Sequence, residues 1–421
     1  MKKAEILKQV AEVMHNDAAC CKDKKDDYFP KYELLIKEEM SDNNFLLTVN
    51  SYLSMFGLTG HLFFKKQGHK CLPFRVHRYG DALYVTDITK DSLLGVGDRI
   101  IEINGDSVNE FYEKHAESFF GEPPERQTPH WNHILKYAEQ IGYIRKSEDV
   151  VQHWNIKLYD WKGEQSPYIF KKITPLITYL KFSDFMNATE ISALLEINDF
   201  ELRTTKNLII DVRGNEGGNS YSYYPLLKYC LPRGKKLKEL DLMDSDVFGS
   251  GQEILYSARN CDVRLEIIEE LMKENCSERD KDILGHAIEK LRELRGKGFV
   301  KEIDDYDNEI IGDSDVENVV ILTDSCCCSA GDAFVNLFKM LPKVKVVGRP
   351  TQGILDYSNV AYALFDEYAL VYPTSRLISL DYGKRMMGKG VSVDNYIPWT
   401  PEHLKRDVDL EYVLKNIFGQ T

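Results

Sequence analysis

The segment from Asp324 to Asp332, read Asp-Ser-Cys-Cys-Cys-Ser-Ala-Gly-Asp, places Ser329 between two regular elements. The apolar, β-branched run 319–322 predicts a buried strand before it, and apolar positions at helical spacing in 333–341 predict a helix after it. A serine at such a sharp turn is held exposed, and N–H groups at the helix start can bind a developing oxyanion. Ser329 therefore has the context of an acyl-transfer nucleophile. The alternative is a helix N-cap, which is the commoner use of a serine at this kind of junction.

A second strand runs into a turn at residues 208–219, read Leu-Ile-Ile-Asp-Val-Arg-Gly-Asn-Glu-Gly-Gly-Asn. Glycines allow backbone N–H groups to approach a ligand without interference from a Cβ atom. The segment lacks the Gly-x-Gly-x-x-Gly spacing of a dinucleotide site and the Lys-Ser/Thr ending of a P-loop. Together with the Ser329 turn it indicates two halves of an oxyanion hole. The predicted donors are the N–H groups of Gly217 or Gly218 and of Ala330.

His61 follows the small residues Thr59 and Gly60 and precedes an apolar run. An imidazole changes protonation near neutral pH, which suits it to serve as a general base. A lone histidine is more often structural, but His61 has the best local context for a base among the ten in the chain.

In this order along nearly the whole chain, the segments resemble the C-terminal-processing (tail-specific) serine peptidases, and among them the tricorn-core-like branch. The family's Leu-Ile-Ile-Asp-x-Arg-x-Asn-x-Gly-Gly segment is matched by 208–218, and its Ser-x-Ser/Gly-Asp/Glu turn by 329–332. Its Val-hydrophobic-Gly-x-x-Thr-x-Gly element is matched by 346–353, and a Gly-Val-x-Pro-Asp-like element imperfectly by 390–394. The resemblance implies a peptidase core with the crotonase-like α/β spiral fold.

Three positions depart from the family. The lysine base of one branch is Ile354 here, so a Ser–Lys dyad in that place is excluded. The tricorn-like branch has a Ser-His pair near the N-terminus, which implies His61 as the base with Gly60 in place of the serine. That branch also carries a glutamate where this chain has Met386-Met387.

The acid that orients His61 is therefore open. We rank Asp356 first because it closely follows the 351–353 turn, then a backbone carbonyl or a water, then Asp381. A loop aspartate that caps its own backbone is the alternative interpretation of Asp356.

The chain is predicted to be an α/β multidomain protein of three parts. Residues 1–66 form an N-terminal helical segment that ends at the candidate base. Residues 67–165 resemble a PDZ module, with an Asn104-Gly105 turn that requires positive φ, although the usual carboxylate-binding loop is absent. Residues 166–421 form the peptidase core, with a mainly helical insertion at about 240–312. A solvated helical hairpin is the favoured interpretation of that insertion, and an active-site lid or a homo-oligomer contact is the alternative.

Composition excludes several classes of function. The net charge is −13, which gives no reason to expect nucleic-acid binding. No apolar run is long enough to span a membrane, and the start lacks the apolar core of a signal peptide. The nine cysteines include neighbouring ones that pair poorly, which fits a reducing cytosol. A Cys328 thiolate nucleophile or a zinc site is conceivable, but cysteine spacing typical of zinc is absent and packing is favoured.

The resemblance implies a serine peptidase acting on peptides or on unfolded or C-terminal segments, and the cysteine usage predicts a cytoplasmic location. No metal or cofactor is implied. The same machinery would also hydrolyse esters. The competing hypothesis is a non-catalytic peptide-binding protein that keeps the fold, which the departures at Gly60, Ile354 and Met387 support.

Overall fold

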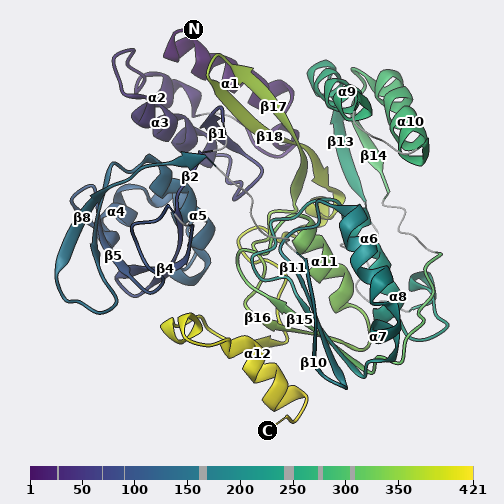
Figure 1. The fold of residues 1–421 in the computed structure, drawn as a ribbon. Coiled ribbons are helices and arrows are strands. Elements are labelled where there is room, and N and C mark those ends of the chain that lie inside the picture. Colours follow the sequence, from purple (N-terminus) through teal and green to yellow (C-terminus); the bar gives the residue numbers. More distant parts are fainter. Residues whose placement is uncertain are drawn as a thin grey trace. The chain divides into compact units, whose positions relative to one another are not determined.

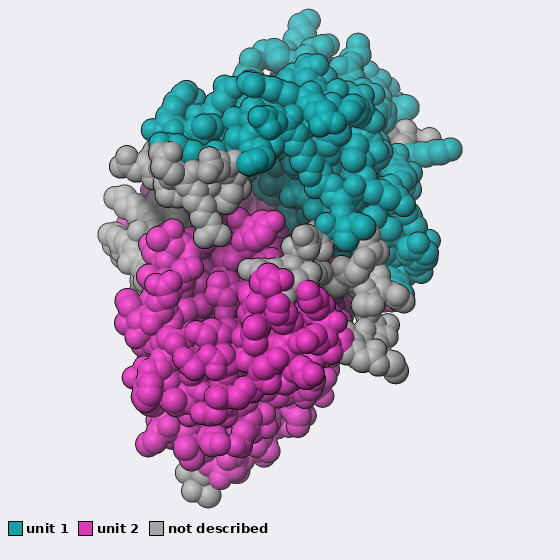
Figure 2. All heavy atoms as spheres, turned by 90° about the vertical axis from the view of Figure 1, so that its right-hand side faces the viewer, with its two compact units in different colours: residues 1–67, 246–304, 356–385 teal, residues 68–245, 305–355, 386–421 magenta. Residues whose placement is uncertain are grey.

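The computed structural model describes residues 1–25, 28–68, 70–89, 91–160, 168–240, 251–273, 278–303 and 309–420. The chain divides into two compact units, each assembled from separate segments. The first unit comprises residues 1–67, 246–304 and 356–385, and the second comprises 68–245, 305–355 and 386–421 (Figure 2). The predicted boundary between the PDZ-like module and the core, and parts of the predicted insertion, lie outside the described residues.

The first unit is built on a sheet with the strand order β1-β18-β13-β14, and β17 pairs with β18. Its strands are β1 (Phe63–Lys66), β13 (Gln252–Tyr256), β14 (Gly298–Glu302), β17 (Tyr357–Phe365) and β18 (Tyr368–Leu377). Every residue of β18 is buried, because this strand pairs with β17, β1 and β13. All these pairings are antiparallel.

Helices of the first unit come from its first two segments. They are α1 (Lys3–Asn16), α2 (Phe29–Glu33), α3 (Asp42–Ser54), α9 (Ala258–Lys273) and α10 (Glu278–Leu294). The α1 and α3 helices bury apolar residues at helical spacing, such as Ile6, Val10 and Val13 in α1. The α9 and α10 helices, which fall within the predicted helical insertion, pack on each other. Apolar residues of both helices also pack on Ile254 and Tyr256 of β13.

The second unit contains a mostly parallel sheet with the order β10-β11-β12-β15-β16-β19. Its strands are β10 (Tyr168–Thr174), β11 (Ile177–Phe182), β12 (Asn207–Asp211), β15 (Asn318–Thr323), β16 (Val344–Gly348) and β19 (Asn395–Tyr396). Only β10 runs antiparallel to its neighbour. β12 and β15 precede the two predicted halves of the oxyanion hole. These two strands are adjacent and parallel, and their pairing runs from Asn207 opposite Asn318 to Asp211 opposite Leu322.

Helices cover both faces of this sheet (Figure 1). The core helices are α6 (Ala188–Ile197), α7 (Asp199–Thr204), α8 (Leu227–Cys230), α11 (Ala330–Lys339) and α12 (Val408–Tyr412). On one face, residues of α12 and the C-terminal segment pack against Ile209, Val320 and Val347. Successive strand residues point to opposite faces, so Ile210 and Ile321 point to the other face. The predicted α/β class is therefore confirmed.

A β-rich module precedes that sheet, with the order β3-β4-β5-β7-β8. Its main elements are β3 (Phe74–Tyr79), β4 (Ala82–Ile88), β5 (Arg99–Ile103), β6 (Asp106–Ser107), α4 (Val108–Lys114), α5 (Thr128–Ile134), β7 (Gln140–Ile144) and β8 (Val151–Asn155). β5 and β6 pair across Asn104-Gly105, whose φ values are 53° and 86°. The predicted tight turn with two positive φ values is confirmed.

Within the described ranges, none of the helices has both the length and the apolar character needed to cross a lipid bilayer.

Candidate active site

Ser329 lies at the junction between β15 and α11, as the sequence predicts. Its backbone has φ 56° and ψ −117°, a conformation that residues other than glycine rarely adopt. Such strain persists only where the surroundings enforce it, and it gathers at functional sites. A strained strand-to-helix turn is also how a serine nucleophile is presented in other folds. An ordinary helix N-cap has extended backbone angles, so simple capping does not explain this geometry.

Asp332 anchors the turn through its carboxylate. Its Oδ2 accepts hydrogen bonds from the N–H groups of Ser329 (2.9 Å) and Ile354 (3.0 Å), and its Oδ1 accepts one from Gly353 (2.7 Å). The carboxyl group is fully buried, and burial raises its pKa to about 6, although these N–H groups and the Thr351 hydroxyl oppose the rise. One carboxylate therefore ties the nucleophile to the 351–354 turn.

The glycine turn after β12 packs directly against the serine turn. A Cβ atom added to Gly217 would lie 2.7 Å from Ser329 Cβ, 3.1 Å from the Cys328 carbonyl oxygen and 3.2 Å from the Ala330 nitrogen. The Gly217 N–H donates to Asn215 Oδ1 at 2.9 Å. Among the residues with described positions, the Gly218 and Ala330 N–H groups have no hydrogen-bond acceptor. Of the two glycines, Gly218 is thus the better candidate donor.

We expect Gly217→Ala to displace the Ser329 turn, because the new methyl group would overlap it and because φ is 86° at this position. Gly214→Ala is the matched control, since φ there is 71° but no atom lies within 4 Å of the added Cβ. Both variants bear a similar backbone penalty of about 1–2 kcal/mol. Only Gly217→Ala should also lose covalent labelling by a fluorophosphonate. Equal labelling of the two variants would contradict the close packing of the turns.

His61 belongs to the first unit, as does Asp356, whereas Ser329, Gly217, Gly218 and Ala330 belong to the second. The Nδ1 atom of His61 is 2.7 Å from the carbonyl oxygen of Tyr357. A carbonyl can only accept, so Nδ1 carries the proton and the neutral ring offers Nε2 as the basic nitrogen. The acceptor on Nδ1 is thus a backbone carbonyl, the second choice of the sequence analysis. The identity of a backbone acceptor has no signature in the sequence.

The two aspartates considered for this role differ in their surroundings. Asp381 accepts a hydrogen bond from Arg376 Nη2 at 2.7 Å, and this bond lowers the pKa of its carboxyl group. Asp356 is 1% exposed and directly precedes Tyr357, and its carbonyl oxygen accepts from the Leu377 N–H. Its role as the orienting acid stays a prediction.

Arg126 is a contributor that the sequence analysis missed. Its guanidinium is buried and donates to the carbonyl oxygens of Thr351 and Gln352, each at 2.9 Å. The 351–354 turn is therefore held by Arg126 on its carbonyl side and by Asp332 on its N–H side. Arg126 lies between Pro124 and Pro129 in the sequence, and such a proline-containing stretch does not reveal a long-range contact.

The cysteines before Ser329 do not favour thiolate chemistry. Burial is the main cause that raises the pKa of each of the three thiols, Cys326, Cys327 and Cys328, and nearby carboxylates, including Asp324, add to it. A thiol that stays protonated at neutral pH is a poor nucleophile. Packing therefore remains the better explanation of the triplet.

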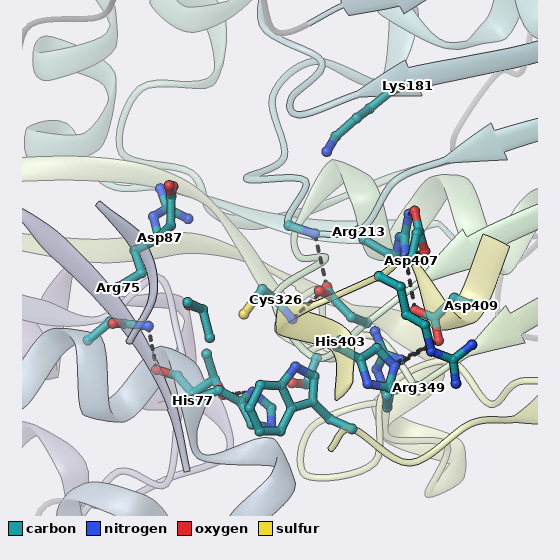
Figure 3. Close-up of a pocket in the computed structure, with 18 residues that line it drawn as sticks. Arg75, His77, Asp87, Lys181, Arg213, Cys326, Arg349, His403, Asp407 and Asp409 are labelled. Atoms are coloured by element: carbon teal, nitrogen blue, oxygen red, sulfur yellow. Dashed lines mark hydrogen bonds and ion pairs between the residues drawn. The ribbon is translucent and has the colours of Figure 1, made fainter. Parts of the chain in front are cut away.

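A separate pocket of about 460 Å³ lies at the carboxyl ends of the parallel strands (Figure 3). Lys181, Arg213, Asp324 and Arg349 line it, from four neighbouring strand ends. Two of the arginines that line it are paired with aspartates. Arg213 binds Asp211, Asp407 and Asp409, and Arg349 binds Asp409 at 2.8 Å. Neither Ser329 nor any predicted oxyanion donor lines this pocket as described, so it is distinct from the candidate active site.

The family model described as Peptidase family S41 matches residues 176–397, more than half of the chain. The chain belongs to peptidase family S41. It is accordingly a serine-type peptidase, and the resemblance to C-terminal-processing peptidases is confirmed. The S41 match includes both the Gly217-Gly218 turn and Ser329.

Solved structures resemble this chain in fold over more residues than the family model matches. The structure titled mature CPAF is 13% identical, with a TM-score of 0.64, and the alignment covers 100% of this chain and 98% of that one. The structure of mature CPAF complexed with lactacystin is 14% identical, with a TM-score of 0.63, covering 99% and 97%. At this identity the likeness shows a shared fold alone. No sequence among the curated proteins matches this chain.

Proposed function

We propose that this S41 peptidase cleaves peptide bonds through an acyl-enzyme formed on Ser329, with His61 as the general base. The single observation that carries the proposal is the strained backbone of Ser329 (φ 56°, ψ −117°) at the start of α11. Two further contacts support it. Gly217 packs against the serine, and Asp332 accepts its N–H.

The proposed chemistry has two steps. In the first, Ser329 Oγ attacks the scissile carbonyl while His61 Nε2 takes the hydroxyl proton and passes it to the leaving amine. In the second, a water attacks the acyl-enzyme with the same nitrogen as its base. The Nδ1 bond to the Tyr357 carbonyl supports this role, because it fixes the tautomer in which Nε2 can accept a proton.

The proposed oxyanion donors are the N–H groups of Gly218 and Ala330, on the two turns that Gly217 and Ser329 bring into contact. Gly217 itself would act by close packing, since its N–H is bonded to Asn215. Backbone donors that are already fixed in place stabilise developing charge without reorganisation.

Asp356 stays the proposed acid that adds negative charge near the imidazole. It would have to share the Nδ1 proton with the Tyr357 carbonyl, which is already 2.7 Å away. We expect Asp356→Asn to lower turnover while binding of substrate is retained. Turnover equal to the parent would show that Asp356 is not the orienting acid.

The proposed substrates are peptides or unfolded and C-terminal segments of proteins. We interpret the β3–β8 module as PDZ-like, supported by the Asn104-Gly105 hairpin, and the core sheet as a crotonase-like spiral, supported by its parallel order. Cleavage of an unfolded protein but not of its folded form would support this substrate class.

A fluorophosphonate label tests the Ser–His centre, because only an activated serine reacts. We expect the parent to be labelled and His61→Ala to be labelled at least about 100-fold more slowly, since a positioned base contributes about 10²–10⁴-fold. His153→Ala, at an exposed histidine, is the control and should react like the parent. If His61→Ala is labelled as fast as the parent, His61 is not the base. A parent that is not labelled at all would favour the peptide-binding alternative.

A further inference from the structure

The orientation of His61 depends on how firmly Tyr357 is held. The contact to the imidazole comes from a main-chain carbonyl, and a carbonyl can aim a ring only as accurately as its own residue is fixed. His61 itself has φ 57°, an uncommon conformation for a residue with a side chain. The surroundings of Tyr357 therefore bear directly on the geometry of the base.

Tyr357 is the first residue of β17 and is held at both its main chain and its side chain. On the strand it lies directly opposite Arg376 of β18. Its side chain is 2% exposed, and its hydroxyl donates to Asp23 Oδ2 at 2.8 Å. Burial and this bond both raise the pKa of the phenol, so the hydroxyl keeps its proton and remains a donor.

Arg376 fixes the acceptor of that phenol bond. Its guanidinium donates to Asp23 Oδ2 (2.7 Å) and Oδ1 (3.0 Å), and also to Glu253 Oε2 (2.7 Å) and Asp381 Oδ1 (2.7 Å). The side chain is only 1% exposed. Burial would lower the pKa of the guanidinium, but the three carboxylates outweigh burial and raise it.

This cluster joins all three segments of the first unit. Asp23 comes from residues 1–67, Glu253 from 246–304, and Arg376 with Asp381 from 356–385. A buried arginine with several charge-assisted bonds holds its partners in a defined geometry. The main chain of Tyr357 links this cluster to the imidazole.

We propose that Tyr357, Asp23 and Arg376 are positioning residues for the general base of this peptidase. Arg376 holds the Asp23 carboxylate, Asp23 holds the Tyr357 hydroxyl, and the Tyr357 carbonyl holds Nδ1 of His61. The proposal rests on the proposed function of His61. In this arrangement a neutral carbonyl, backed by a buried ionic network, performs the orienting part of the task of a triad acid.

The test is Tyr357→Phe in the full chain, because it removes only the hydroxyl and leaves the main-chain carbonyl in place. Asp23 keeps both bonds to Arg376 in this variant. The matched control is Tyr372→Phe. Tyr372 is also buried on a strand of this sheet, and its hydroxyl bonds to Asn260 Oδ1 at 2.9 Å. The two variants lose the same chemical group in similar surroundings.

We expect Tyr357→Phe to lower kcat about tenfold with KM unchanged, because a looser base loses part of its contribution. Tyr372→Phe should keep the parent kcat. The unfolding temperatures of the two phenylalanine variants should fall by similar amounts. The NMR resonance of the His61 Nδ1 proton should stay sharp in the control and broaden in Tyr357→Phe. Asp23→Asn, which weakens the same link from its other side, should repeat the loss in kcat.

A kcat equal to the parent in Tyr357→Phe, or an equal loss in both phenylalanine variants, would overturn the network proposal. His61→Ala is measured beside them to separate the two hypotheses. If His61→Ala cleaves like the parent, the proposed function itself fails. If His61→Ala is inactive while Tyr357→Phe is fully active, only the positioning network is wrong.

Discussion

Replacing Ser329 by alanine should abolish fluorophosphonate labelling and reduce peptide turnover at least about 10⁴-fold, as removal of a serine nucleophile does in other peptidases. Substrate affinity should remain, because the glycine turn, the Ala330 N–H and the rest of the site are intact. The free energy of unfolding should change by no more than about 1 kcal/mol, the size of a lost helix cap. Turnover and urea unfolding of the same preparation provide the two measurements.

Two neighbouring residues serve as controls for this variant. Ser325→Ala removes a buried serine whose hydroxyl is 3.4 Å from the Glu125 carbonyl oxygen, and Cys328→Ala removes the adjacent thiol. Both should keep most of the activity. If Ser329→Ala remains active while either control is inactive, the nucleophile has been assigned to the wrong residue. Ser329→Gly should be inactive but more stable than Ser329→Ala, because glycine accepts φ 56° without strain.

The parts of the site that follow from local pattern could be predicted from the sequence. The strand and helix on each side of Ser329 arise from runs of apolar residues whose period is visible in a short window. The β12 turn was found in the same way. Adjacent parallel strands bring their carboxyl ends together, which explains why two turns about a hundred residues apart meet at Gly217 and Ser329.

The support of His61 could not be predicted in this way. It depends on a main-chain carbonyl and on a sheet whose strands β1, β13 and β18 come from three distant segments. Pairing between distant strands is set by packing of the whole unit and leaves no local pattern. Asp332 was visible as part of a motif, but a sequence does not show that its carboxylate serves both the Ser329 and Gly353 N–H groups.

That double use of the Asp332 carboxylate leads to the second large expected effect. We expect Asp332→Asn to lower turnover about 100-fold, the scale that a misplaced reacting group costs. Asparagine offers a single acceptor oxygen. Its NH₂ group would take the place of the other carboxylate oxygen and would face a backbone N–H that it cannot accept from. Either the bond to Gly353 or the bonds to Ser329 and Ile354 must be lost.

Asp324→Asn is the matched control. Asp324 also accepts three N–H bonds, from Gly214, Cys326 and Cys327, but all three go to the same oxygen, Oδ1. An asparagine can keep that oxygen in place, so this variant should retain most of the parent turnover. Equal losses in the two variants would show that any charge change near the turn is damaging, and that the separate use of the two Asp332 oxygens is not the cause.

The pH dependence of unfolding tests the Asp332 carboxylate by a measurement other than turnover. Burial raises the pKa of Asp332 in the folded protein to about 6, above its usual value, so the folded state binds this proton more tightly than the unfolded state. The stabilisation is therefore complete below about pH 4 and is lost as the pH rises through about 6, on the order of 3 kcal/mol in total. The amide in Asp332→Asn cannot titrate, so the stability of this variant relative to the parent should rise over this interval. The activity of the parent should rise as the pH rises through about 6. The proton that stabilises the fold at lower pH occupies a carboxylate oxygen that the Ser329 turn requires as an acceptor. If the free energies of unfolding of the parent and of Asp332→Asn change in parallel between about pH 4 and about pH 7, this account of Asp332 is wrong.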